Sequence, residues 1–120
     1  MKPLQPLTNL DVATKVMDLA ARRMELIASN MANVDTPGYR TRDIDFAAEL
    51  KRAVSAETGT AKSAPSHTVA GLLERPDGNN VSLERENMIM ASTQLQFAAA
   101  SQLLRQQFKQ LQSAIQDGRG

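Results

Sequence analysis

The fold is decided by the stretch Ser29-Asn30-Met31-Ala32-Asn33-Val34-Asp35-Thr36-Pro37-Gly38-Tyr39. A strongly helical pattern runs into this stretch and stops at a cluster of Asn, Asp, Pro and Gly, the residue types that form turns. Long amphipathic segments lie on both sides of it. The sequence therefore predicts two helices that pack against other helices, with a turn that redirects the chain after the first.

The first amphipathic segment follows Pro3 and Pro6, and Thr8 or Asn9 offers a side-chain oxygen that can cap its first turn. Apolar residues then recur at steps of three and four, the heptad spacing of helices that pack side by side. They are Leu10, Ala13, Met17, Ala20, Met24, Ile27, Met31 and Val34. A second apolar row widens this face, so a single partner helix would leave part of it exposed; its members are Val12, Val16, Leu19 and Leu26.

The C-terminal segment opens at Ser82, a good N-cap, with Glu84 and Glu86 in its first turn, where the helix dipole favours negative charge. At about 1.5 Å per residue, this helix would reach roughly 50 Å, which favours an elongated molecule. Its main apolar row comprises Phe97, Ala100, Leu104, Phe108, Leu111 and Ile115. An adjoining row comprises Met88, Ala91, Leu95 and Ala98.

The middle of the chain has weaker patterns. A short helix is predicted over 47–54, a Ser-, Ala-, Thr- and Gly-rich linker over 55–66, an extended or strand-like piece over 68–73 and a turn over 76–80. The sequence thus predicts an all-α fold in which two long terminal amphipathic helices form a coiled-coil-like bundle joined by an irregular middle segment. We expect the parts to be 1–34, 35–81 and 82–120.

The composition excludes several classes of partner. Fourteen basic and thirteen acidic residues give a net charge of +1 without a basic cluster, so nucleic acid is not expected as a partner. Cysteine is absent, which excludes disulfides and thiolate metal sites. Acidic and basic residues share the first helix, which argues against insertion into lipid. The N-terminal residues contain no apolar run like that of a signal peptide, so any export is expected to proceed without a cleaved signal.

The sequence shows no catalytic pattern, and we expect no catalytic residues, cofactor or metal. The only histidine, His67, lies in a loop-like segment, and Asp35 stands beside turn residues whose backbone it is expected to bond. Asp43 and Asp45 could supply paired carboxylates in principle. A small hydrolytic enzyme is therefore kept as a rival hypothesis.

The stretch 28–39 resembles the signature of the flagellar rod and hook family, Ser-Asn-(Ile/Met/Leu)-Ala-Asn-x-x-Thr-x-Gly-Tyr. The Asp-Thr-Pro-Gly-Tyr version of it, followed by Arg42-Asp43-Ile44-Asp45-Phe46, is similar to the short members that build the proximal rod. The block 78–86 and the chain length also resemble those members. Ser82 stands where relatives commonly have Asp, but either oxygen can cap a helix.

This resemblance implies a structural subunit of the proximal rod of the bacterial flagellar basal body, which transmits torque from the motor ring to the hook. It implies export by the flagellar type III apparatus and a place in the periplasm. The implied partners are further copies of the chain, FlgC- and FlgF-type rod subunits, a FliE-type adaptor and the MS-ring protein. A rod subunit of the FlgC type remains an alternative, and a small enzyme that acts on the periplasmic wall is the rival from another class, because a rod must pass through the wall.

Physical chemistry suggests roles for the motif residues. Asn30 and Asn33 can bond the last helical carbonyls or neighbouring chains, and Tyr39 can pack its ring while its hydroxyl stays hydrogen-bonded. The motif or turn residues are Ser29, Asn30, Asn33, Asp35, Thr36, Pro37, Gly38 and Tyr39. A plain helix stop is the simpler alternative, but it would not need Asn30, Asn33 and Tyr39.

The two helices are expected to bury their apolar rows against each other and against neighbouring subunits, with folding and assembly as one event. We call this predicted contact set the assembly seam. Its residues are Leu10, Met17, Met24, Ile27, Met31, Phe97, Leu104, Phe108, Leu111 and Ile115. A self-contained helical hairpin is the alternative.

Overall fold

The computed structural model describes residues 9–55 and 61–118. Three α-helices contain most of these residues, in agreement with the predicted all-α class, and a pair of two-residue strands is the only sheet among them. In chain order, the elements are α1 (Asn9–Ala32), β1 (Arg42–Asp43), α2 (Phe46–Ser55), the 3-10 helix η1 (Ala61–Ser63), β2 (His67–Thr68) and α3 (Leu83–Gly118).

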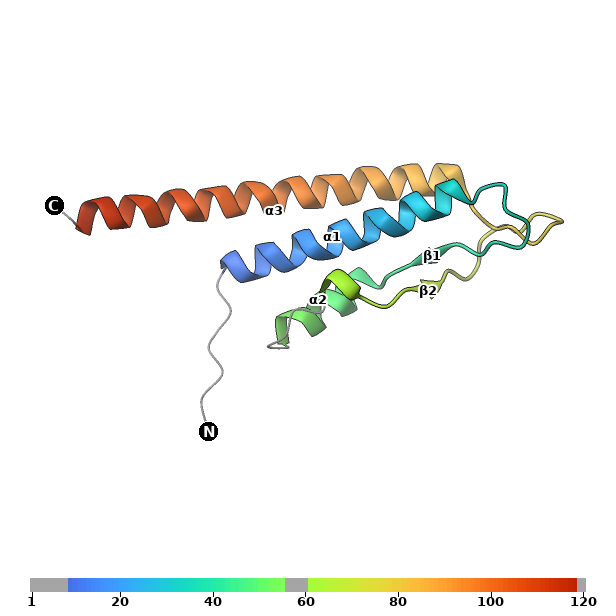
Figure 1. Ribbon diagram of the computed structural model, residues 1–120, viewed down its shortest axis with the longest axis horizontal. Helices are drawn as coiled ribbons and strands as arrows, with labels where there is room; N and C mark the ends of the chain where they lie inside the picture. The colour runs from blue at the N-terminus through green and yellow to red at the C-terminus, as the bar shows by residue number, and fades with distance from the viewer. Residues whose placement is uncertain (1–8, 56–60, 119–120) are drawn as a thin grey trace, which may run out of the picture.

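The two long helices lie side by side and run in opposite directions, and the middle elements pack along the other side of α1 (Figure 1). The molecule measures 70 × 35 × 17 Å and has a radius of gyration of 18.6 Å. A compact chain of this length would have a radius of roughly 14 Å. The elongated shape expected from the helix lengths is therefore confirmed.

Two faces of α1 are covered by different parts of the same chain. Ala13, Ala20 and Ile27 recur every seven residues and are buried on the side of α3. Leu19 and Leu26 point to the middle elements, where they form the core with Ile44, Ala53, Ala61 and Ala64. The second apolar row of α1, which the sequence assigned partly to neighbouring subunits, is therefore buried within the monomer at these two leucines.

The middle of the chain is more ordered than a linker. The predicted short helix is confirmed as α2, and residues 56–60 of the predicted linker lie outside the described residues. Residues 61–64, however, form η1 and place Ala61 and Ala64 in the core. The linker prediction is wrong there. It rested on composition, and a segment rich in small residues can be either a flexible linker or a segment that packs closely against a helix.

Short polar side chains mark where the helices begin. The Ser82 hydroxyl accepts a hydrogen bond from the Arg85 amide at 3.2 Å, which confirms the predicted cap of α3. Asp45 caps α2 in the same way through the Ala48 amide. In the predicted extended piece, only Thr68 is in a strand; β2 pairs antiparallel with β1. No helix within 9–55 and 61–118 has both the length and the apolarity needed to cross a bilayer.

Candidate assembly site

The turn after α1 is held by its own polar side chains. Asn33 donates its side-chain amide to the Ser29 carbonyl at 2.8 Å, so it bonds a last helical carbonyl as expected. Its own side-chain oxygen accepts the Thr36 hydroxyl at 3.0 Å, and its carbonyl accepts the Thr36 amide. Gly38 then adopts a φ of 75°, a left-handed conformation that other L-residues rarely adopt. The motif thus ends the helix and reverses the chain.

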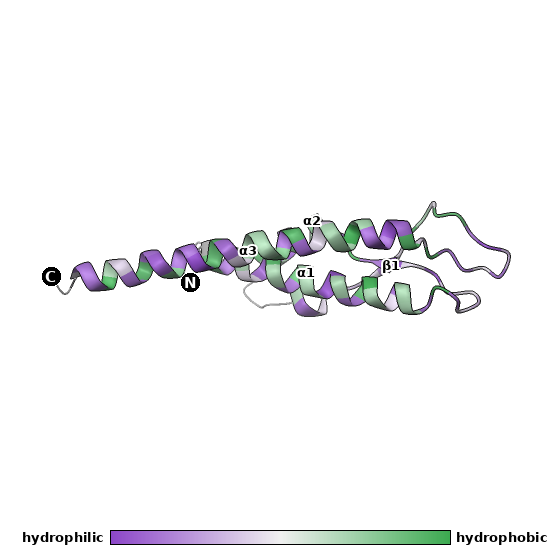
Figure 2. Ribbon diagram, turned by 90° about the horizontal axis from the view of Figure 1, so that it is seen from above, coloured by the Kyte–Doolittle hydropathy of each residue, from purple (hydrophilic) through white to green (hydrophobic). Residues whose placement is uncertain are grey.

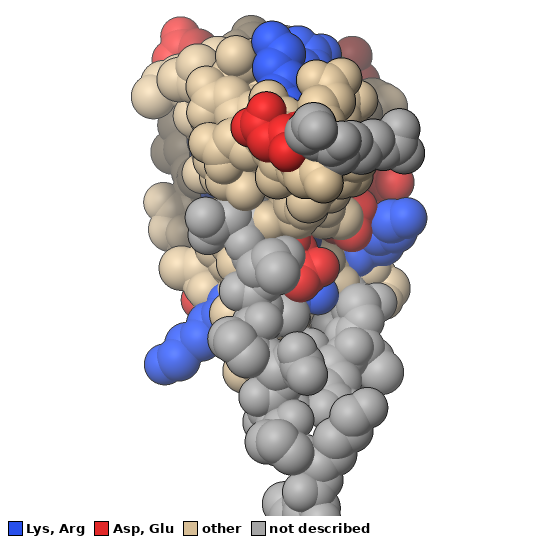
Figure 3. All heavy atoms as spheres, turned by 90° about the vertical axis from the view of Figure 1, so that its left-hand side faces the viewer, with Lys and Arg blue, Asp and Glu red and all other residues tan. Residues whose placement is uncertain are grey.

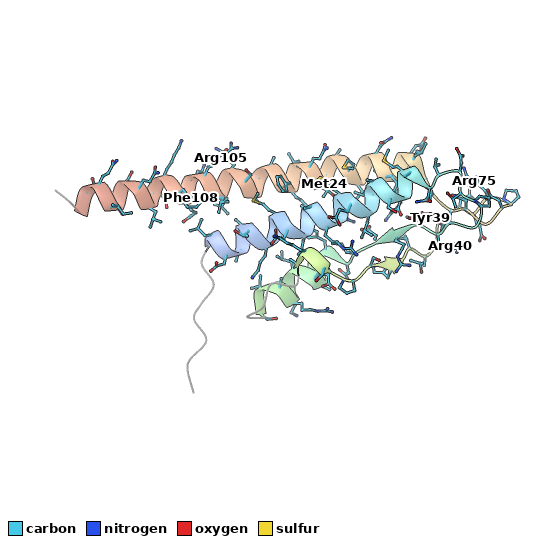
Figure 4. The ribbon with its side chains drawn as sticks, viewed as in Figure 1. Met24, Tyr39, Arg40, Arg75, Arg105 and Phe108 are labelled. Carbon is cyan, nitrogen blue, oxygen red and sulfur yellow. The ribbon has the colours of Figure 1, made fainter. Side chains whose placement is uncertain are left out.

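Asn30 does more than end a helix. Its side-chain oxygen accepts the Arg42 amide at 3.1 Å and the Tyr39 hydroxyl at 3.0 Å, while its amide donates to the Arg42 carbonyl at 2.8 Å and to Glu86 at 3.1 Å. Asn30 is 1% exposed. It therefore joins α1 to both the returning chain and α3, and the sequence did not predict this connection within one subunit. Figure 4 places Tyr39 in the chain beyond the end of α1.

Two arginines share one buried carboxylate where β1 meets the long helices. Arg23 donates Nε and Nη2 to the two oxygens of Asp43 at 3.0 and 2.9 Å, and Arg85 donates Nη2 to Asp43 at 3.0 Å. Arg85 also pairs with Glu86 at 2.9 Å. We refer to Arg23, Asn30, Asp43, Arg85 and Glu86 as the polar cluster. It ties α1, β1 and α3 together through bidentate, charge-assisted hydrogen bonds.

The pKa values of the two acids in the polar cluster, Asp43 and Glu86, are shifted in opposite directions. Burial alone would raise the pKa of Asp43, but hydrogen bonds and charge from Arg23, with the Ile44 amide and Arg85, hold it below its ordinary value of 3.8. For Glu86, burial dominates and raises the pKa above 4.5, although Asn30 and Arg85 oppose this effect. Glu86 is fully buried, and its Oε2 atom has no hydrogen-bond partner within the described part of the chain.

Asn79 and Asn80 close the other side of the turn. Asn79 donates its side-chain amide to the carbonyls of Asn33 and Thr36 at 3.0 and 2.8 Å, and Asn80 accepts the Thr41 amide at 2.7 Å. Both asparagines are buried. The sequence placed them in a turn and in the block 78–86 that resembles the family, but gave them no contacts. Their position just before a helix cap, next to a glycine, was the available signal.

Close backbone contact accompanies these bonds. Gly38 donates its amide to the Asp77 carbonyl at 2.9 Å, and a Cβ atom added to Gly78 would lie 3.4 Å from the Gly38 Cα. Asp35, Thr36 and Pro37 are exposed at the tip of the turn. The motif therefore has an inner part, which contacts residues 77–80 just before α3, and an outer part, which faces solvent.

The predicted assembly seam divides along its length. In α1, Ile27 is 2% exposed, and Leu10, Met17, Met24 and Met31 are partly buried. Figure 4 shows Met24 between α1 and α3. In α3, Phe97 and Leu104 are partly buried. Three seam residues remain about half exposed, namely Phe108, Leu111 and Ile115.

These exposed residues lie where α3 continues past α1. With 36 residues against 24, α3 is longer by about 18 Å at 1.5 Å per residue. Figure 1 shows this free length, and Figure 2 shows apolar residues continuing along it. Figure 4 places Phe108 beyond the start of α1. We call residues 105–118 the overhang.

A second apolar row of α3 is also uncovered. Met88 and Leu95 are 73% and 72% exposed, and Ala91 and Ala98 continue the same row. We call these four residues the outer stripe. A cavity of about 300 Å³ lies between α1 and α3 near the start of the overhang, lined by apolar residues such as Val12, Val16 and Leu103. The helix pair is thus incompletely packed at the end where the overhang begins.

The groups considered as catalytic candidates have structural partners or lie exposed in the described part of the chain. The carboxylate of Asp43 is paired with Arg23 and Arg85, and Asp45 caps α2. His67 is exposed, with its Nδ1 3.1 Å from the Thr68 carbonyl oxygen. Among residues 9–55 and 61–118, no group of three or more His, Cys, Asp or Glu side chains could hold a metal ion. On the face drawn in Figure 3, acidic and basic side chains are scattered among other residues.

Comparisons with known proteins agree on one family. The family model described as "Flagella basal body rod protein" matches residues 10–40, which span α1 and the turn. The chain is 32% identical to the flagellar basal body rod protein FlgB of Escherichia coli strain K12, over 93% of this chain and 99% of the relative.

Two further relatives carry the same name. The FlgB protein of Salmonella typhimurium is 35% identical over 93% of this chain and 99% of its own length. That of Cereibacter sphaeroides is 35% identical over 88% of this chain and 92% of its own length. The similarity therefore extends well beyond the turn motif, into the middle elements and α3.

Proposed function

This chain belongs to the family of flagellar basal body rod proteins, and on that premise we propose that it is a structural subunit of the rod that assembles through the apolar faces of its long helices. One observation carries the mechanism: α3 extends past α1 and keeps Phe108, Leu111 and Ile115 about half exposed. Burying apolar side chains is worth about 1.5 to 3 kcal/mol each when it is complete, so this surface favours association.

Only one end of the helix pair, the end with the polar cluster, has its geometry fixed by contacts within the monomer. The polar cluster and the Asn79–Asn80 lead fix the two long helices relative to each other. Neighbouring subunits then cover the overhang and the outer stripe. The sequence predicted that folding and assembly are one event. We now limit this proposal to the overhang and the outer stripe, because α1 buries Leu19, Leu26 and Ile27 within the chain.

The finer assignments belong to the same proposal. The subunit lies in the proximal rod within the periplasm, reaches it through the flagellar type III export apparatus without a cleaved signal, and transmits torque from the motor ring to the hook. Its neighbours are further copies of the chain, FlgC- and FlgF-type rod subunits, a FliE-type adaptor and the MS-ring protein. Support comes from the family and from the uncovered apolar rows.

An enzyme that acts on the periplasmic wall has less support. Such an enzyme needs an acid and a base that converge on a substrate, with access from solvent. Asp43 is buried and paired with Arg23 and Arg85, whereas Asp35 and His67 are exposed. We therefore propose no catalytic role, and the relatives are named as rod proteins.

Quantitative mass spectrometry of purified basal bodies tests the proposed function. The chain should be present at a fixed ratio to the other rod subunits, and a strain that lacks it should form no rod and should not swim. Absence of the chain from intact basal bodies would overturn the proposal. A FlgC-type position would instead place it at a different ratio and a different height in the rod, which labelling of one terminus would reveal.

A further inference from the structure

The apolar cavity between the two long helices lies at the end of the pair where α1 begins. Val12 and Val16 of α1 lie on one wall, and Leu103 of α3 lies on the other. Among the residues that line it, Gln96 alone is polar. An apolar cavity of about 150 Å³ can hold a benzene-sized group. This cavity, at about 300 Å³, therefore has room for one or two leucine side chains.

We propose that the occupant is the segment of this chain that directly precedes α1, with Leu4 and Leu7 packed in the cavity. Asn9 is the first residue of α1. Val12 and Val16 lie about 5 and 11 Å further along the helix at 1.5 Å per residue. A segment of eight residues that enters the helix at Asn9 is long enough to cover that distance.

The sequence at the start of α1 has the pattern of a hydrophobic staple. Because α1 begins at Asn9, the N-cap position falls on Thr8 and the position before it falls on Leu7. In a staple, the residue before the N-cap packs against the fourth residue of the helix, which here is Val12. Val12 lines the cavity. This contact directs the incoming chain towards the cavity and brings Leu7 to its opening.

The prolines place Leu4 on the same side of the segment as Leu7. Pro3 and Pro6 have a fixed φ, and each favours an extended conformation in the residue before it. An extended chain of the polyproline II type has three residues per turn and rises about 3.1 Å per residue. Leu4 and Leu7 are three residues apart, so they share one face and lie about 9 Å from each other. With Leu7 at the opening, Leu4 reaches the level of Val16, one helical turn further along α1.

The polar side chains of the segment can stay in water in this arrangement. Lys2 and Gln5 are also three residues apart, so they share a different face from the two leucines. Pro6 has no backbone N–H, so one donor fewer needs a partner beside the apolar walls. The segment therefore offers an apolar face to the cavity and a polar face to solvent.

A segment of the same chain also has an advantage over a separate partner. Its tether keeps it near the cavity at an effective concentration in the millimolar range. The two prolines reduce the conformational freedom that docking would remove. The contact forms within one chain, so this inference goes beyond the proposed function and does not depend on it. Docking would close the helix pair at the point where the overhang begins.

Methyl NMR of the full-length chain tests the placement of both leucines. Leucine and valine methyl groups are labelled with ¹³C, and nuclear Overhauser contacts from the segment to the helices are measured. We expect contacts from Leu4 to Val16 and to Leu103, on opposite walls of the cavity. An isotope-filtered measurement on a mixture of labelled and unlabelled chains separates contacts within one chain from contacts between copies.

Thermal unfolding of two matched double variants tests the contribution to stability. Leu4→Ser with Leu7→Ser should lower the Tm by about 5 °C or more, because two apolar side chains lose their burial. Lys2→Ser with Gln5→Ser makes the same number of changes on the polar face of the same segment. That control should shift the Tm by less than about 2 °C.

The opposite results would overturn the inference. A contact from Leu7 to Val12 without contacts from Leu4 to Leu103 would mean that the staple forms while the cavity stays open. Contacts that come only from another copy would identify a different occupant. Equal Tm shifts in the two double variants would mean that the leucines are not buried. None of these results bears on the proposed function, which fails only if the chain is absent from basal bodies.

Discussion

The two ends of α3 differ in how far their side chains are buried within the monomer. At its N-terminal end, Glu86 is fully buried and Arg85 is paired with Asp43, and the contacts come from the same chain. At its C-terminal end, Phe108, Leu111 and Ile115 are about half exposed, and no part of the described chain covers them. One end is complete in the monomer, whereas the other end has an apolar surface that needs a neighbour.

This difference means that one end of the subunit fixes the arrangement of its helices, while the other end provides affinity for a neighbouring subunit. Hydrogen bonds and ion pairs have directional requirements, so the polar cluster permits one arrangement of α1, β1 and α3. Apolar contact is less directional and scales with area, so the overhang can favour assembly without itself fixing the fold. The rigid polar cluster at one end of the 36-residue helix can thereby position the apolar surface at the other end, about 35 to 45 Å away.

The sharpest test of this division compares two isoleucines of the predicted seam. Ile27→Asp places a carboxylate at a site that is 2% exposed, and it should destabilise the monomer by about 4 kcal/mol or more. Ile115→Asp, at a site 53% exposed, should change stability by less than about 0.5 kcal/mol. Urea unfolding followed by far-UV circular dichroism measures both. Equal effects would mean that the buried row of α1 and the overhang of α3 do not differ as described.

The polar cluster is tested by Asp43→Asn. Loss of the carboxylate removes the ion pair of Arg23 and leaves Arg85 paired with Glu86 alone, so the free energy of unfolding at pH 7 should fall by about 3 kcal/mol. Because the folded pKa of Asp43 is lowered, its stabilising contribution is present above about pH 4, near the pKa of unfolded Asp, and disappears as the pH falls through the lower folded pKa.

The difference between wild type and Asp43→Asn should therefore shrink in acid. Asp35→Asn is the matched control, since Asp35 is exposed at the tip of the turn, and its effect should stay within about 0.5 kcal/mol. A destabilisation by Asp43→Asn that does not diminish at the lowest pH at which the protein stays folded would mean that the ion pairs are not its cause.

The turn is tested by Gly38→Val. Gly38 has a φ of 75° and open space around its Cβ position, so the expected cost of about 1 to 2 kcal/mol is purely conformational. Gly118 has equally open surroundings but no positive φ, and Gly118→Val should cost less than about 0.5 kcal/mol. Unfolding curves measure the cost, and swimming in soft agar measures its consequence. A Gly38→Val protein with wild-type stability and motility would remove this residue from the mechanism.

Sequence patterns predicted the long helices and the turn because these depend on local signals: heptad spacing, the Ser82 cap and the Pro37–Gly38 pair. They missed the polar cluster, because Asn30 and Glu86 are 56 residues apart and polar residues in a helix pattern normally indicate solvent. They also missed the packing of Ala61 and Ala64 against α1, because small residues produce the same composition in a linker and in a close contact.

The smallest expected change in stability belongs to the overhang, yet its effect on assembly should be complete. Phe108→Asp leaves the monomer within about 0.5 kcal/mol of wild type, because the side chain is already 53% exposed. In the assembly, the same carboxylate would be desolvated against the apolar neighbour that covers the row, so the chain should disappear from basal bodies. Gln110→Asp adds the same charge two residues further along, off the apolar row, and should be incorporated normally. Normal incorporation of both variants would mean that the overhang is not covered in the rod; loss of both would mean that charge, rather than the apolar row, controls assembly at this end of α3.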